Sequence, residues 1–166
     1  MRIEVTPASR GQEPILANLL ELYIHDFSEF HPVQIGPDGR FGYDKLPLYW
    51  SNAGRFPYLI TVDGSLAGFA FVKRGSEISG AEDVWDLAEF FVLRAYRRLG
   101  VGKDAAHAVW LTHAGKWEVR VLESNAAARQ FWERAGRVFA GDGLRSDDIE
   151  KDGRRWTVFS LESKRG

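Results

Sequence analysis

The chain has 166 residues, and its 45% hydrophobic and 27% charged content is ordinary for a soluble globular protein. Its net charge of −1 argues against a broad basic face for nucleic acid, and no apolar run approaches the roughly eighteen residues of a membrane span. The absence of cysteine excludes disulfides, thiolate metal sites and cysteine nucleophiles. We therefore expect one cytoplasmic domain over residues 1–166, with no nucleic-acid, membrane or metal partner.

The first half of the chain predicts a strand, a helix, a long aromatic loop and a hairpin. Apolar residues from Ile15 to Phe27 recur at helical spacing after Pro14, which a helix tolerates in its first turn. Asp63-Gly64 between two apolar runs is a strong hairpin signal. In chain order we expect a strand at 2–6, a helix at 14–27, a loop at 31–55 with a short helix at 49–53, and strands at 58–62 and 66–73.

The second half predicts alternating strands and helices, followed by two more strands. Gly115 and Gly136 follow helical patterns and are expected to end them, and Ser124 can cap the second of these helices. In chain order we expect a strand at 87–93, a helix at 101–113, a strand at 117–122, a helix ending before Gly136, and strands at 137–140 and 155–161 around a charged loop at 142–153. This order predicts one mixed α/β sheet with helices on both faces.

Residues 88–103 carry the strongest functional signal of the chain. An apolar strand is followed by Arg94, Arg97 and Arg98, and then Gly100-Val101-Gly102 opens a helix. Free backbone N–H groups and the positive end of a helix dipole attract anions there, and glycine lets a ligand approach the main chain. The segment therefore predicts a phosphate cradle with a cationic rim, although such a turn also occurs without any ligand.

Two other phosphate-binding motifs share a glycine turn of this kind. A P-loop does not fit, because Lys103 is followed by Asp104 where that motif needs serine or threonine. A dinucleotide-binding turn would place its third glycine at Ala105, and Glu123 stands at the distance of its ribose-binding acid. This alternative stays open, although that motif normally opens its domain and here follows about ninety residues.

Two segments together resemble a known family. Residues 97–102, Arg-Arg-Leu-Gly-Val-Gly, fit the Arg/Gln-x-x-Gly-x-Gly/Ala signature of the GNAT acyl-CoA N-acyltransferases. Residues 117–121, followed by Asn125-x-x-Ala-x-x-Phe-Trp-x-x-x-Gly136, resemble that family's second motif. Residues 22–30 together with 88–103 are similar to a small bacterial group of predicted acetyltransferases. The resemblance implies the GNAT fold: a mixed, mostly antiparallel sheet of about six or seven strands, helices on both faces and a splayed central strand pair.

The resemblance also implies acetyl-CoA as cosubstrate and a place for it. Backbone N–H groups from Arg98 to Lys103 would bind the CoA pyrophosphate, with charge added by Arg97, Arg98 and Arg94. Backbone groups at 91–93 would pair with the pantetheine arm, and Asn125 and Trp132 would line its other side. The implied cofactor-binding residues are Phe91, Val92, Leu93, Arg97, Arg98, Leu99, Gly100, Val101, Gly102, Lys103, Asn125 and Trp132.

Glu89 is the candidate catalytic base for amine attack on the thioester. An amine of pKa about 10.4 is almost wholly protonated at neutral pH, so a group must take its proton, directly or through a water. A carboxyl between Ala88 and Phe90 on a buried strand should have a raised pKa. The alternative is a structural carboxylate paired with an arginine or a loop amide.

The acid that protonates the departing thiolate is in doubt, because Trp132 stands where many family members have tyrosine. Tyr96 is a distant substitute, and a thiol that ionises near pH 8.5 can leave without an acid. Phe27, Tyr43 and Trp50 lie in the aromatic loop region that would shape the acceptor pocket.

We therefore expect acetyl transfer from acetyl-CoA to a primary amine of a small molecule or peptide, by direct attack in a ternary complex. A catalytically weak acyl-CoA sensor or interaction domain, and an unrelated nucleotide-binding enzyme, are the alternatives. A homodimer and a monomer are both compatible with the sequence.

Overall fold

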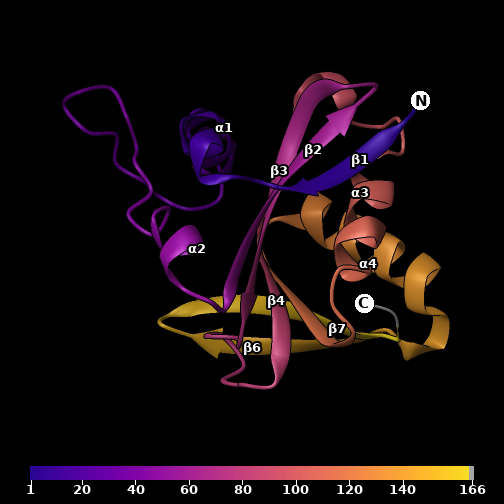
Figure 1. The fold of residues 1–166 in the computed structure, drawn as a ribbon. Helices are drawn as coiled ribbons and strands as arrows, with labels where there is room; N and C mark the ends of the chain where they lie inside the picture. Colours follow the sequence, from indigo (N-terminus) through magenta and orange to yellow (C-terminus); the bar gives the residue numbers. More distant parts are fainter. Residues whose placement is uncertain (165–166) are drawn as a thin grey trace.

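One seven-stranded sheet organises residues 1–164, the part of the chain that the computed structural model describes. The strand order is β1-β2-β3-β4-β5-β7-β6, and every neighbouring pair is antiparallel except β4 and β5 (Figure 1). The principal elements are β1 (Ile3–Pro7), α1 (Glu13–Phe27), α2 (Leu48–Ser51), β2 (Arg55–Val62), β3 (Ser65–Arg74), β4 (Val84–Val92), α3 (Val101–Trp110), β5 (Gly115–Leu122), α4 (Ala126–Ala140), β6 (Arg145–Lys151) and β7 (Arg154–Ser163).

Helices cover both faces of the sheet, as the sequence predicts. Side chains alternate along β3, so Phe69 and Phe71 pack with Leu16 and Leu20 of α1, while Ala70 and its alternate neighbours pack beneath α3 and α4. Figure 1 shows α1 and α2 on one side of the sheet and α3 and α4 on the other. We call these the α1 face and the α3 face.

The expected splayed central pair is present between β4 and β5. Their parallel ladder covers only Val84–Asp86 and Lys116–Glu118, although β4 continues to Val92 and β5 to Leu122. In the β3–β4 ladder, Phe71 pairs with Glu89 but Val72 pairs with Leu87, so Ala88 is an extra residue. This bulge bends β4 away from β5. We call the unpaired stretch beyond Asp86 the β4–β5 split.

The region after β5 differs from the sequence prediction. Helix α4 begins after Asn125, whose side chain accepts the Ala128 N–H, and it runs through Gly136 to Ala140, so the predicted strand at 137–140 is wrong. The strand β6 lies instead at 145–151, inside the predicted charged loop. Leu144 packs directly against the backbone of Gly136. A Cβ at position 136 would lie 2.7 Å from Leu144 Cδ1, which is too close, so glycine permits this packing within the helix.

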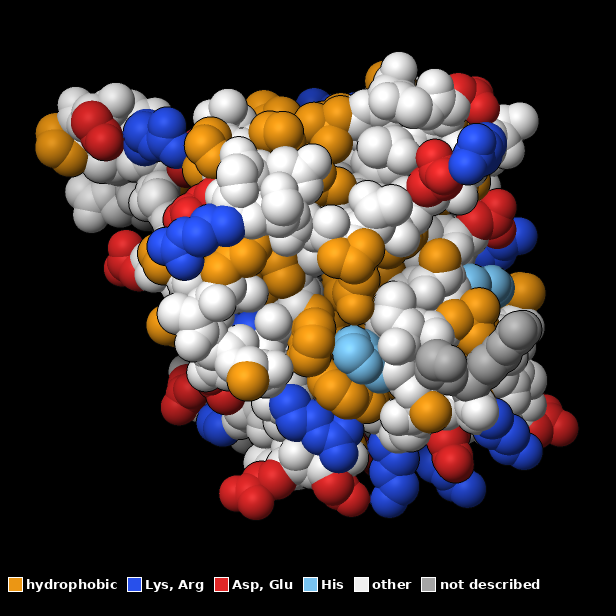
Figure 2. All heavy atoms as spheres, in the orientation of Figure 1, with side chains coloured by type: hydrophobic (Ala, Val, Ile, Leu, Met, Phe, Trp, Pro, Cys, Tyr) orange, Lys and Arg blue, Asp and Glu red, His pale blue; other side chains and the backbone are white. Residues whose placement is uncertain are grey.

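The segment between α1 and α2 extends away from the body of the protein, at the upper left of Figures 1 and 2. Glu21 of α1 anchors it: one carboxylate oxygen accepts the Phe41 N–H at 2.7 Å, and the other accepts the Gly42 N–H at 2.9 Å. The short helix expected at 49–53 is present as α2. No helix within residues 1–164 is both long and apolar enough to span a bilayer.

Candidate active site

The β4–β5 split leaves backbone groups of β4 without a neighbouring strand. Leu93 donates its N–H to Ala67 of β3. Because hydrogen-bonded and non-hydrogen-bonded positions alternate in an antiparallel ladder, the Phe91 N–H also points to β3 and the Val92 N–H points into the split. The Val92 carbonyl accepts Nε of Arg97 at 2.8 Å. The free main-chain groups therefore include the Val92 N–H, while those of Leu93 are used within the chain.

Glu89 stands directly after the bulge and faces the α1 side of the split. Its side chain is 14% exposed, and Oε1 lies 3.7 Å from Nη2 of Arg120. Burial raises the pKa of Glu89, opposed by the positive charge of Arg120 and by a hydrogen bond from Tyr23, while the charge of Asp86 raises it further. The site is therefore built to hold a carboxyl group that takes up a proton more readily than an exposed one.

Arg120 joins Glu89 to a second buried acid. Nη1 of Arg120 lies 3.0 Å from Oδ2 of Asp86, whose side chain is 3% exposed. Both residues face the α1 side, since Asp86 pairs with Lys73 on β3 and Arg120 lies two residues beyond Glu118 on β5. Residue type alone did not single out Arg120 or Asp86, because their proximity comes from strand pairing.

Aromatic residues of the α1 face cover this group of charges. Burial and then the charge of Glu89 raise the pKa values of Tyr23 and Tyr43 well above their usual range, and Tyr23 also donates a hydrogen bond to that carboxylate. Phe27 stacks on Tyr23 one helical turn further along α1. Trp50 donates Nε1–H to the Ala8 carbonyl. The predicted acceptor residues thus share one face; the charge of Glu89 acts on Tyr43, and the polar end of Trp50 is directed elsewhere.

The N-terminus of α3 has the geometry of an anion cradle. Arg98 and Gly100 adopt left-handed conformations with φ of 62° and 85°, and the first helical bond runs from Asp104 N–H to the Gly100 carbonyl. The N–H groups at 101–103 therefore have no partner within the helix. A Cβ on Gly102 would lie 3.1 Å from the Phe131 ring of α4, so glycine permits the close approach of these helices.

In the part of the chain that the structure describes, two of the three arginines before this helix form ion pairs, and the third does not. Asp26 of α1 accepts a hydrogen bond from Arg94 at 2.6 Å and another from Arg97 at 2.7 Å. Arg97 is thereby fixed between α1 and the end of β4. Arg98 is exposed and has no ion pair within residues 1–164, and Lys103 lies 3.5 Å from Asp104. Leu99 is exposed beside them.

Comparison with known proteins identifies the family. The sequence profile of the acetyltransferase (GNAT) family matches residues 16–136, a stretch that contains most of α1, the split and the α3 N-terminus. The chain belongs to the acetyltransferase (GNAT) family. No curated protein sequence matches it significantly.

Solved structures of GNAT acetyltransferases share the whole fold. An acetyltransferase from Thermus thermophilus has 15% identity and a TM-score of 0.71, with 98% of each chain covered. The ribosomal-protein-S18-alanine N-acetyltransferase of Escherichia coli has 16% identity and a TM-score of 0.61, covering 99% of this chain and 96% of its own. A GNAT acetyltransferase from Elizabethkingia anophelis with acetyl-CoA bound has 14% identity and a TM-score of 0.63, covering 97% and 98%.

The second GNAT motif places Trp132 in the core. Trp132 is 8% exposed, meets the Phe90 ring edge-on at 5.0 Å and lies 6.0 Å from the Trp110 ring. Asn125 caps α4 through its side-chain oxygen. Tyr96 packs against the cluster around Val101 on the α3 face, on the opposite side of the sheet from Glu89.

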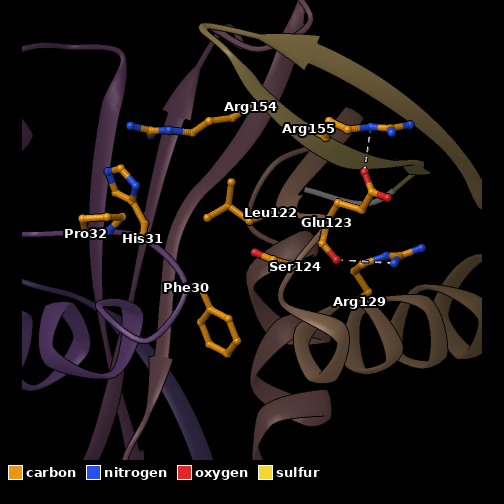
Figure 3. A pocket seen from close by; sticks show the side chains of 9 residues that line it. All are labelled: Phe30, His31, Pro32, Leu122, Glu123, Ser124, Arg129, Arg154 and Arg155. Carbon is orange, nitrogen blue, oxygen red and sulfur yellow. Dashed lines mark hydrogen bonds and ion pairs between the residues drawn. The ribbon is translucent and has the colours of Figure 1, made fainter.

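A hollow of about 590 Å³ opens at the end of β5 (Figure 3). It lies between the segment after α1 and the start of β7. Its lining residues are Phe30, His31, Pro32, Leu122, Glu123, Ser124, Arg129, Arg154 and Arg155. Sequence reasoning did not identify this hollow, because its walls come from three distant segments. Within residues 1–164, no three His, Asp or Glu side chains gather in a group that could hold a metal ion.

Proposed function

We propose that this GNAT-family protein transfers an acetyl group from acetyl-CoA to a primary amine by direct attack in a ternary complex. The observation that carries the proposal is the position of Glu89. This buried carboxyl lies at the bulge where β4 leaves β5, and its pKa is raised mainly by burial. A carboxylate with a raised pKa accepts a proton from an amine better than an exposed carboxylate does.

The residues around the split fit acetyl-CoA, which supplies an activated acyl group when it is bound. The N–H groups at 98–103, of which those at 101–103 have no partner within the helix, would bind the pyrophosphate, with charge from Arg98 and Lys103. Gly102 itself adds no side chain there and lets the ring of Phe131 pack against the start of α3. We assign Arg97 a positioning role, since it already binds Asp26 and the Val92 carbonyl.

The rest of the binding site lies along the two strands. The main-chain edge of β4 at Val92 would bind the pantetheine arm as an added strand would, and Asn125 and Trp132 would form the opposite wall. Phe91 would contribute no main-chain hydrogen bond, because its N–H points to β3. Leu93 would contribute only its side chain, because its N–H and carbonyl bind Ala67 and Tyr96. The backbone around the bulge would direct an N–H to the thioester oxygen.

Glu89 would take the proton of the attacking amine, directly or through one water. Arg120 and Tyr23 would hold the carboxylate in place and keep its pKa low enough for release of that proton. Trp132 has an indole N–H and cannot act as an acid, so the thiolate would leave unprotonated. A thiol that ionises near pH 8.5 makes this feasible at neutral pH.

Two measurements test the proposal. Calorimetric titration with CoA, beside NADH and ATP controls, should show selective CoA binding. Thiol release across a panel of primary amines should then fall by about 10²- to 10³-fold in Glu89→Gln, without a change in CoA affinity. Unchanged rates in this variant would remove Glu89 as the base.

An acyl-CoA sensor is the second candidate, and Trp132 is the observation that favours it. A core tryptophan in place of an acidic tyrosine fits a domain that binds the cosubstrate without turnover. Tight CoA binding with no thiol release from any amine would select this candidate. Selective binding of NADH or ATP would contradict both.

A further inference from the structure

The hollow at the end of β5 lies on the same face of the sheet as Glu89. Leu122 follows Arg120 by two residues on β5, so both side chains point to the α1 face, about 7 Å apart along the strand. Leu122 pairs with Trp156, and Arg154 lies two residues before Trp156, so Arg154 reaches the same face. The hollow is therefore next to the place where an acceptor amine would meet Glu89.

The walls of the hollow carry an excess of positive charge. Arg155 is paired with Glu123 at 2.9 Å, and Arg129 contacts the Glu123 carbonyl. Arg154 is exposed and has no ion pair within residues 1–164. Figure 3 shows its guanidinium extending over His31, while Leu122 and the neighbouring proline and phenylalanine supply an apolar floor.

His31 adds little positive charge beside Arg154. Burial lowers the pKa of His31, and the positive charge of Arg154 lowers it further, so the imidazole is mostly neutral at neutral pH. Arg129 also has no ion pair within residues 1–164, but it donates to the Glu123 carbonyl and lies across the hollow from His31 (Figure 3). One exposed guanidinium above a neutral ring matches a single negative charge at the His31 end of the hollow. A carboxylate fits this end better than a phosphate dianion, for which a second cation would have to lie beside Arg154.

The phosphates of CoA have a different binding place. The N-terminus of α3 packs on the α3 face, where Val101 and Ala105 contact Ile60 and Val92. Arg154 reaches the α1 face, on the other side of the sheet. Its charge is therefore available to the acceptor.

We propose that the acceptor is an amine that also carries a carboxylate, with the amine at Glu89 and the carboxylate bound by Arg154 over His31. This inference rests on the proposed acetyl transfer and names its substrate class. The carboxylate can belong to a free amino acid or to an acidic peptide, and the test includes both. A charged hydrogen bond to Arg154 would satisfy the exposed guanidinium above the apolar floor of the hollow.

The experiment compares matched acceptors on the full chain saturated with acetyl-CoA. The free amino acids are L-alanine, β-alanine and 4-aminobutyrate, each beside its carboxamide, which covers different amine-to-carboxylate spacings. The peptides are the C-terminal amides of Ala-Glu and Ala-Gln. We expect at least one carboxylate to exceed its neutral partner about tenfold in kcat/KM for thiol release.

Arg154→Gln should abolish that preference. Arg145→Gln is the matched control, because Arg145 is an equally exposed arginine at the opposite end of the β6–β7 hairpin. The control should retain the preference. Equal rates for carboxylates and carboxamides, or an unchanged preference in Arg154→Gln, would overturn the proposal. So would a tenfold loss of CoA affinity in Arg154→Gln without an effect on acceptors, which would assign the hollow to the cosubstrate.

Calorimetry with the same acceptors and the chain–CoA complex separates this proposal from the acetyl transfer itself. Selective binding of a carboxylate, lost in Arg154→Gln but without thiol release, would support the acceptor site and contradict the proposed reaction. Thiol release without carboxylate preference would contradict the acceptor site alone. A complex that binds neither carboxylates nor carboxamides would overturn the acceptor site.

Discussion

Arg120 lies 3.7 Å from Glu89 across the β4–β5 split, and its other terminal nitrogen lies 3.0 Å from Asp86. One guanidinium therefore serves two buried carboxylates. The positive charge lowers the pKa of Glu89, whereas the negative charge of Asp86 raises it. Substitution of either neighbour changes the proton affinity of Glu89 without touching the carboxyl itself.

The pH dependence of the reaction should reveal this coupling. A general base works when it is deprotonated, so the acidic limb of kcat/KM should lie above pH 4.5, the ordinary pKa of a glutamate. Arg120→Gln removes the lowering charge and should move the limb to higher pH by about one unit. Asp86→Asn removes the raising charge and should move it in the opposite direction.

The measurement is thiol release as a function of pH for the wild type and both variants. Circular dichroism at each pH checks that the variants remain folded, because each substitution removes a buried partner. Limbs that move in the same direction, or do not move, would exclude Glu89 as the titrating base.

Asp26 should contribute to stability through Arg94 and Arg97. Burial alone would raise the pKa of Asp26, but hydrogen bonds from Arg97 and Arg94 outweigh it and lower the pKa from 3.8. Such a group contributes stability above its unfolded pKa, and the contribution disappears as pH falls through the folded value. Because both arginines are substantially exposed, we expect Asp26→Asn to lose only about 1 kcal/mol at pH 7.

Urea unfolding at pH 7, 5 and 3 measures this contribution. The difference between wild type and Asp26→Asn should be equal at pH 7 and 5 and smaller at pH 3. Glu29→Gln is the control, because Glu29 is exposed near the end of the same helix and has no ion pair within residues 1–164. A difference that persists unchanged at pH 3 would contradict the ion-pair explanation.

Gly100 should be required for the conformation of the cradle. Its φ of 85° is unfavourable for a residue with a Cβ, although the added atom would meet nothing within 4 Å. We expect Gly100→Ala to lower stability by about 1–2 kcal/mol and the melting temperature by about 2–8 °C, with weaker CoA binding. Gly143→Ala is the control: its φ lies outside the left-handed region and its added Cβ makes only an ordinary contact. Equal melting temperatures for both variants would contradict this expectation.

The sequence predicts the parts of this protein whose signals are local. Glycine spacing at 100–102 predicted the helix N-terminus, and the Asp63-Gly64 turn between two apolar runs predicted the β2–β3 hairpin. The edge strand β6 was missed because its residues, Arg-Ser-Asp-Asp-Ile-Glu-Lys, are mostly exposed and carry no apolar pattern. The end of α4 was misplaced because Gly136 serves packing against Leu144 instead of ending the helix.

The sequence singled out a candidate site residue only where that residue differs from its immediate neighbours in the chain. Glu89 could be singled out as an acid in an apolar strand. Its partners Arg120 and Tyr23 could not, since one is on β5 and the other is spaced like a core residue of α1. The pairing of Asp26 with Arg97 joins positions 71 residues apart, and no periodic pattern encodes such a contact.

Trp132 provides a test of whether the reaction needs an acid. Trp132→Tyr introduces the hydroxyl that many relatives place there, and Trp132→Phe removes the indole without adding an acid. Both variants leave unfilled space beside Phe90 and Trp110, so each should lose roughly 1–3 kcal/mol of stability. If the thiolate leaves unaided, the two variants should have kcat values within about twofold of each other at pH 7. A tyrosine variant about ten times faster than the phenylalanine variant would show instead that proton donation to the thiolate limits the wild-type rate.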